Sequence, residues 1–116
     1  MSGVARASER MFTSGDIAMV ANAVLSAAHG LGVRPKRFTA VWVMQAAVNG
    51  YAVGDEVEIT SGWFTSAPAP YGCASSDATN IYAAIGATNP TIWDRSTGAQ
   101  ASPGIGNFKV RFRAWA

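Results

Sequence analysis

The chain has 116 residues, with nine Lys and Arg against seven Asp and Glu and a formal net charge of +2 at pH 7. One cysteine and one histidine exclude a disulfide within the chain and cannot supply a zinc site with four nitrogen or sulfur ligands. The charge excess is too small to indicate nucleic-acid binding, and no apolar run reaches the ~20 residues that span a bilayer. With no targeting segment, we expect one soluble domain made in a cytoplasm.

Charged residues are scarce in this chain. They make up 14% of it, against about 25% in an average soluble domain, while hydrophobic residues make up 49%. A small domain has much surface to cover, so either small uncharged residues cover it or neighbouring subunits do. The composition therefore favours assembly.

Residues 1–13 are expected to form an N-terminal arm and residues 14–116 a single domain. Residues 16–28 fit two patterns. Ser14 and Gly30 are candidate caps of a short helix. Its apolar residues at helical spacing are Ile17, Val20, Ala21, Val24, Leu25 and Ala28. The alternative is two short strands hinged at residues 21–23, with Ile17 and Met19 facing inward, and we favour the strands because of the resemblance described below.

The turn "AHGLGVRP" holds the only histidine. The imidazole of His29 can donate through one ring nitrogen and accept through the other, which would tie the turn to a neighbouring strand. Gly30 and Gly32 permit backbone angles that a Cβ forbids, and Pro35 stiffens the exit. A Ser–His–acid triad is conceivable, but no sequence marks a nucleophilic serine. We interpret His29 as a structural joint and expect no enzymatic activity.

The next segment predicts two strands joined by a turn. In "RFTAVWVMQAA" both alternating faces are apolar, which is typical of a central strand. The Asn-Gly pair ending at Gly50 favours a tight turn, and Gly54 and Asp55 lead into "DEVEIT", a strand with one polar face. Its acids, with Asp77, could contribute to a calcium site, but a solvated acidic face is the better interpretation.

Residues 61–80 predict a loop. Loops of about 20 residues are uncommon in compact domains and usually carry function or contacts. Trp63, Phe64 and Tyr71 could stack there on a sugar ring or a partner protein, with core packing as an equal alternative. Cys73 is expected to be a buried or partly buried spectator.

The end of the chain predicts "IYAAI" and "TIWD" as short strands and "NFKVRFRAWA" as the most regular strand. Its cations Lys109, Arg111 and Arg113 alternate with apolar residues, so one face is basic, and Trp115 shares that face. Together with the acids of residues 55–58, these cations suit charge pairing between copies, and two solvated faces are the alternative. The strands and turns predict an all-β, small antiparallel β-sandwich, jelly-roll-like in type.

Four segments, "AHGLGVRPKRFTAVWV", "GYAVGDEVEI", "DATNIYAAIG" and "FKVRFRAWA", resemble a domain of bacteriophage virion proteins. In that family an H-G-L-G-x-x-P turn enters a central strand and a G-Y-x-x-G-D-E turn follows. The resemblance covers residues 26–116. The matching turn positions are His29, Gly30, Leu31, Gly32, Pro35, Gly50, Tyr51, Gly54 and Asp55.

The resemblance implies a multimeric β-sandwich exposed on the particle and used for assembly or host contact. We expect a virion location, with other copies of the chain (as a trimer), neighbouring virion proteins and a host-surface glycan as partners. Because no long shaft-forming region is present, a capsid decoration, a head fibre or a small tail component is favoured. We expect no cofactor, metal, nucleic acid or membrane. The alternative function is a carbohydrate-binding module that uses the aromatic residues of the loop.

Overall fold

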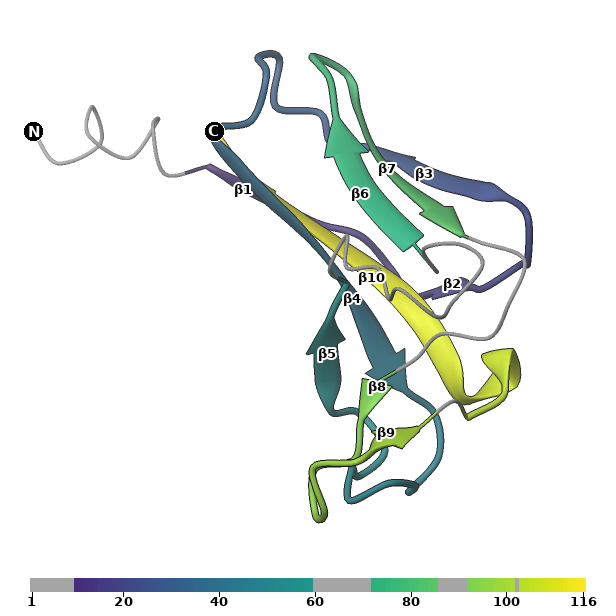
Figure 1. The fold of residues 1–116 in the computed structure, drawn as a ribbon. Helices are drawn as coiled ribbons and strands as arrows, with labels where there is room; N and C mark the ends of the chain where they lie inside the picture. Colours follow the sequence, from purple (N-terminus) through teal and green to yellow (C-terminus); the bar gives the residue numbers. More distant parts are fainter. Residues whose placement is uncertain (1–9, 60–71, 86–91, 102) are drawn as a thin grey trace, which may run out of the picture.

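The computed structural model describes residues 10–59, 72–85, 92–101 and 103–116 (Figure 1). Within them the secondary structure is almost entirely β, which confirms the expected fold class. The strands are β1 (Met11–Thr13), β2 (Ile17–Ala18), β3 (Val24–Ala28), β4 (Arg37–Met44), β5 (Glu56–Glu58), β6 (Gly72–Ser76), β7 (Asn80–Ile85), β8 (Ile92–Trp93), β9 (Gln100–Ala101) and β10 (Phe108–Trp115), with a short 3-10 helix η2 (Ile105–Asn107).

The larger sheet is built on two long antiparallel strands, β4 and β10. They pair along their whole length, from Phe108 opposite Met44 to Trp115 opposite Arg37. The strand order is β1-β10-β4-β5, and β2 also pairs with β10. The expectation that residues 37–47 hold a central strand agrees with this order, because β4 has a strand on each side and its last five residues are buried.

The smaller sheet has the order β3-β7-β6, and β8 and β9 form a third, two-stranded sheet. The prediction of an unbroken loop over residues 61–80 is wrong at its end, since Gly72–Ser76 is a strand that pairs with β7. The small residues of this segment are compatible with a loop and with a strand, and the cross-strand partners in β7 decide in favour of the strand. The positions of Trp63, Phe64 and Tyr71 lie outside the described residues.

One apolar core lies between the two larger sheets, in a sandwich-like arrangement. β10 contributes Phe108, Val110 and Phe112, and β4 contributes Trp42 and Met44, all at most 2% exposed. The rings of Trp42 and Phe108 lie 5.6 Å apart at 48°. The smaller sheet closes this core from the other side. Its buried or partly buried contributors are Leu25, Ala27, Ala74, Ile81, Ala83 and Ile85.

Residues 16–28 form strands and a turn, so the alternative of a short N-terminal helix is wrong. Ser14, a candidate helix cap, instead lies between β1 and β2 and bonds to β10: its N–H donates to the Phe112 carbonyl at 2.9 Å, and its hydroxyl accepts from the Phe112 N–H at 2.9 Å. Asn22 has φ 57°, which breaks a right-handed helix. Val20 and Val24, which a helix would have buried, are 54% and 64% exposed.

β1 lies inside the range expected to be an N-terminal arm. Met11, Phe12 and Thr13 pair with the last residues of β10, so the sheet begins before residue 14. None of the described residues belongs to a helix long and apolar enough to cross a membrane.

Candidate assembly surfaces

His29 is buried directly after β3, where the chain leaves the smaller sheet for β4 of the larger one. It is 3% exposed. Its Nδ1 accepts from the Leu31 N–H at 3.2 Å, so Nε2 carries the ring proton and donates to the Asp77 carbonyl at 3.0 Å. The His29 N–H also donates to the Thr79 carbonyl at 3.1 Å. The ring thus connects the loop after β3 with the turn between β6 and β7.

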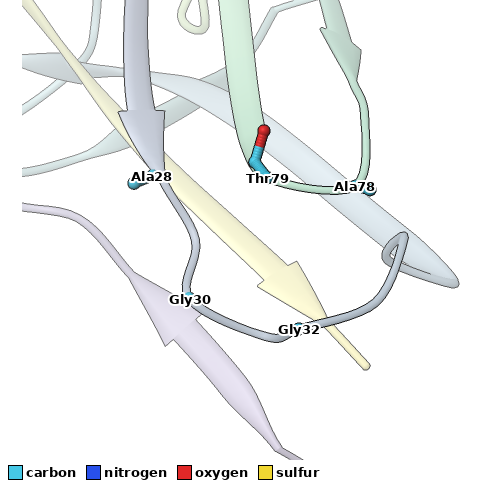
Figure 2. A pocket seen from close by; sticks show the side chains of 5 residues that line it. All are labelled: Ala28, Gly30, Gly32, Ala78 and Thr79. Atoms are coloured by element: carbon cyan, nitrogen blue, oxygen red, sulfur yellow. The ribbon is translucent and has the colours of Figure 1, made fainter.

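The glycines beside His29 have left-handed backbones, with φ of 64° at Gly30 and 75° at Gly32. A side chain there is strained whatever space surrounds it. Pro35 and Leu31 are buried, which fixes the loop against the sheet. Beyond the end of β3 the loop borders a hollow of about 360 Å³ (Figure 2). Its lining residues are Ala28, Gly30, Gly32, Ala78 and Thr79.

Asp77 organises the turn that His29 reaches. Its carboxylate accepts from the backbone N–H of Asn80 at 2.7 Å, the backbone N–H of Thr79 at 2.9 Å and the Tyr82 hydroxyl at 2.8 Å. These bonds favour the charged form, so they hold the pKa of Asp77 well below its usual range and raise the pKa of Tyr82. No described residues form the calcium site considered from the sequence, because no group of three or more His, Cys, Asp or Glu among them is placed to hold a metal.

The Asp77 carboxylate predicts an acid dependence of stability. Its folded-state pKa lies below the unfolded value of about 4, so its stabilisation is complete above about pH 5 and is lost as the pH falls further. We expect Asp77→Asn to melt at a lower temperature than the wild type at pH 6, with a difference that shrinks towards pH 2. Thermal unfolding followed by circular dichroism measures this difference. A difference that stays constant over this range contradicts the prediction.

The second turn is also built as a tight connection. Asn49 and Gly50 have φ of 54° and 80°, and Val48 and Tyr51 exchange backbone hydrogen bonds of 3.2 and 3.0 Å across them. A Cβ on Gly50 would lie 2.8 Å from the Ser96 backbone nitrogen, so only glycine fits. The Asn-Gly pair therefore predicted this tight turn correctly.

A cluster of Tyr51, Trp93 and Arg95, here called the aromatic tip, was not predicted from the sequence. The Tyr51 hydroxyl donates to the Trp93 carbonyl at 2.7 Å, and the Arg95 guanidinium lies 4.4 Å from the Tyr51 ring centroid. Hydrogen bonds from the Ser96 hydroxyl and Asn49 lower the pKa of Asp94 to about 2. The Asp-x-Ser-Thr-Gly pattern at residues 94–98 was the available signal, since Asp caps such turns.

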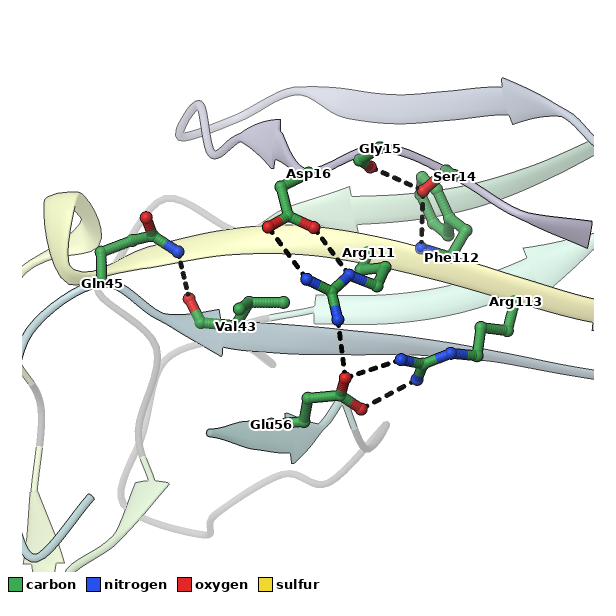
Figure 3. Close-up of polar contacts among 9 residues, drawn as sticks. All are labelled: Ser14, Gly15, Asp16, Val43, Gln45, Glu56, Arg111, Phe112 and Arg113. Atoms are coloured by element: carbon green, nitrogen blue, oxygen red, sulfur yellow. Dashed lines mark hydrogen bonds and ion pairs between the residues drawn. The ribbon is translucent and has the colours of Figure 1, made fainter. Parts of the chain in front are cut away.

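Two of the three cations of β10 are paired within the chain (Figure 3). Arg111 binds both oxygens of Asp16, at 2.7 and 3.1 Å, and reaches Glu56 at 2.8 Å. Arg113 binds both oxygens of Glu56, at 2.8 and 2.6 Å. The pKa of each carboxyl is lowered, first by these bonds, to Arg111 for Asp16 and to Arg113 for Glu56. The opposite charges expected to meet between copies therefore meet within one.

The paired charges lie across β10, β4 and β5 on the outer face of the larger sheet. Val41 and Val43 of β4 lie in register between these strands and are 6% and 2% exposed. The alkyl parts of long cationic side chains cover apolar surface in this way. Lys109 is exposed, and Trp115 lies under the Arg37 guanidinium, 4.6 Å from the ring centroid.

The outer face of the smaller sheet has the opposite character. Alternate residues of its three strands point away from the core, and none of them is charged. They are Val24, Ser26, Ala28, Cys73, Ser75, Asn80, Tyr82 and Ala84. Cys73 is exposed, so the expectation that it is buried or partly buried is wrong. This uncharged face is the surface that the low charge content of the chain predicted, although the sequence did not locate it.

No family model matches the chain, and no curated protein matches it. The resemblance to the phage virion domain therefore rests on the turn and strand motifs. The residues that carry those motifs lie at His29 and its glycines and at the Asn-Gly turn. Both positions fix the backbone and neither forms a cleft with converging polar groups.

Proposed function

We propose that this chain is a structural protein of a bacteriophage particle, a small β-sandwich subunit exposed on the capsid or tail that works by assembly. The observation that carries the proposal is the uncharged outer face of the β3-β7-β6 sheet. The solvent-facing side of a sheet usually carries polar and charged residues, whereas this face combines apolar side chains with Ser, Asn and Tyr and has no charge, which suits contact with protein.

The distribution of charge supports assembly on one face. Arg111 and Arg113 form ion pairs with Asp16 and Glu56, so the larger sheet presents charged side chains of both signs to solvent. The smaller sheet has no charged side chain in its three strands. This asymmetry separates a surface suited to water from a surface suited to a neighbour.

The environment of His29 supports a non-enzymatic function. Both ring nitrogens bond to backbone groups, one to Leu31 and one to Asp77, and the ring is buried. A general base needs a free nitrogen within reach of a substrate proton. The phage context comes from the resemblance, and position on the particle (capsid decoration, head fibre or tail component) is left to the experiment.

Particle purification tests the proposal. Particles of the phage that encodes the chain are banded in a density gradient, and mass spectrometry of the band is expected to find the chain in a fixed ratio to the major capsid protein. Antibody labelling seen by electron microscopy then gives its position on head or tail. A chain found only among the soluble proteins of the lysate contradicts the proposal.

The carbohydrate-binding alternative has one supporting observation. Trp93 is 56% exposed at the aromatic tip and offers a ring on which a sugar could stack. The three aromatic residues first considered for that contact lie outside the described residues. A host-surface glycan is accordingly the second partner proposed for the same particle protein.

A further inference from the structure

β3 is an edge of the smaller sheet, and among the described residues no strand lies on its far side (Figure 1). The Ile85 N–H donates to the Ala23 carbonyl at 2.8 Å, and the His29 N–H donates to the Thr79 carbonyl at 3.1 Å. In an antiparallel pair, hydrogen-bonded positions alternate along the strand. Residues 23, 25, 27 and 29 therefore bond to β7, and the intervening residues direct their N–H and C=O groups to the open edge.

The open edge has none of the usual protection against strand pairing. Val24, Ser26 and Ala28 are exposed, and the strand sequence VLSAA contains no charge, proline or glycine. Soluble proteins commonly place lysine, proline or a bulge on such an edge because it is a template for another strand. The sheet face next to it is uncharged as well, so a paired strand would continue an uncharged surface.

We infer that β3 pairs with β3 of a second copy, antiparallel and about a two-fold axis, with Ser26 opposite its counterpart. This register places Val24 of each copy opposite the partner's Ala28. Val24, Ser26 and Ala28, whose backbone groups point to the open edge, then all lie in hydrogen-bonded pairs. The two three-stranded sheets become one six-stranded sheet. The pairing deepens the proposed function, on which it rests only for its biological setting, by naming the partner of the open edge of β3 and extending the uncharged face across two copies.

The side chains of β3 suit this self-pairing. Each valine meets an alanine on the outer face, and Leu25 meets the partner's Ala27 on the core face, so large and small side chains are matched. Leu25 and Ala27 are only partly buried in one copy and lose more exposed surface in the pair.

Charge permits a second copy as the partner, and the matched sizes of the facing side chains favour it. A strand placed opposite itself brings like charges together, which excludes strands such as β10 with its three cations. β3 is uncharged and pairs with itself without this repulsion. A two-fold pair also differs from the trimer expected from the resemblance, so the oligomeric state distinguishes the two.

Solution mass tests the pairing. We expect light scattering to give the mass of a dimer for the wild type, and of a monomer for Ser26→Lys, which sets two ammonium groups opposite each other. The control is Ser75→Lys, which should remain dimeric. Ser75 lies on the same outer face and in the same cross-strand row, through Tyr82, but at the other edge of the sheet. A wild-type monomer or trimer, or a dimer that survives Ser26→Lys, overturns the inference.

A second variant tests the register even if Ser26→Lys fails to fold. Ser26→Cys in a Cys73→Ser background should form a disulfide-linked dimer on mild oxidation, since paired Cα atoms about 5.5 Å apart are within disulfide range. Leu25→Cys in the same background meets Ala27 and should stay unlinked; linkage of Leu25→Cys alone contradicts the register. A wild-type monomer that still bands with phage particles overturns the pairing and leaves the proposed function standing, whereas a dimer absent from particles does the reverse.

Discussion

Replacing Phe112 with alanine is expected to lower the free energy of unfolding by about 3–5 kcal/mol, the usual cost of deleting a buried aromatic side chain. The Phe112 side chain is fully buried, in the middle of β10 and in the core between the two sheets. Its loss removes apolar contacts and leaves a cavity that flanking strands cannot fill, because their positions are fixed by the ladder to β4.

Denaturant unfolding at one fixed protein concentration measures this change, since self-association would make stability depend on concentration. Phe38→Ala is the matched control. Phe38 lies on the same face of the neighbouring strand but is 37% exposed, so its loss should cost less than half as much. Equal losses in the two variants contradict the position of the core.

Replacing His29 with alanine is expected to lower the free energy of unfolding by about 2–4 kcal/mol. The substitution leaves two backbone groups, the Leu31 N–H and the Asp77 carbonyl, without their partner at a buried site, and each costs about 1–3 kcal/mol. The same denaturant experiment measures it. A loss below about 1 kcal/mol contradicts the role of the ring as a joint.

His29→Gln is the informative companion to this variant. A glutamine amide can donate to the Asp77 carbonyl in place of Nε2, but its flexible side chain does not hold an acceptor at the position of Nδ1 as the rigid ring does, so the bond from Leu31 is weakened or lost. Its loss of stability should therefore lie between those of the wild type and His29→Ala. A glutamine variant as unstable as alanine would show that the ring shape, and not its hydrogen bonds, stabilises the junction.

The elements that could be predicted from the sequence are those strands whose residue pattern shows which of their faces are buried. β10 shows this directly, because Phe108, Val110 and Phe112 are buried while Lys109 is exposed. The alternation of apolar and cationic residues follows from the pleat of the strand, so no partner needs to be known. β4 was equally clear, since its two apolar faces require cover on both sides.

Residues 16–28 were ambiguous for a physical reason. Small and β-branched residues at positions 17–28 satisfy a helical repeat and a strand alternation alike, and only long-range pairs separate them. Ile17 opposite Val110 and Val24 opposite Ala84 are such pairs. β6 was missed for the same reason, because its strand state depends on β7.

The candidate surfaces were predicted unevenly. The basic residues of β10 were recognised, but their acids come from residues 16 and 56, and no local pattern indicates that Asp16 and Glu56 flank Arg111. The uncharged face had no local signal either, because alanine and serine are compatible with core, loop and surface. Its character appears only when three strands are placed side by side.

β10 also has a consequence for the kinetics of folding. It pairs with β1, β2 and β4, and its partners, such as Met11 opposite Trp115, lie far back along the chain. Folding slows as contacting residues lie further apart, since a long loop must close before its contacts form. The hairpin of β6 and β7, by contrast, closes over a few residues. The larger sheet, with β10 at its centre, is therefore the part of the molecule whose assembly sets the time that the chain needs to fold.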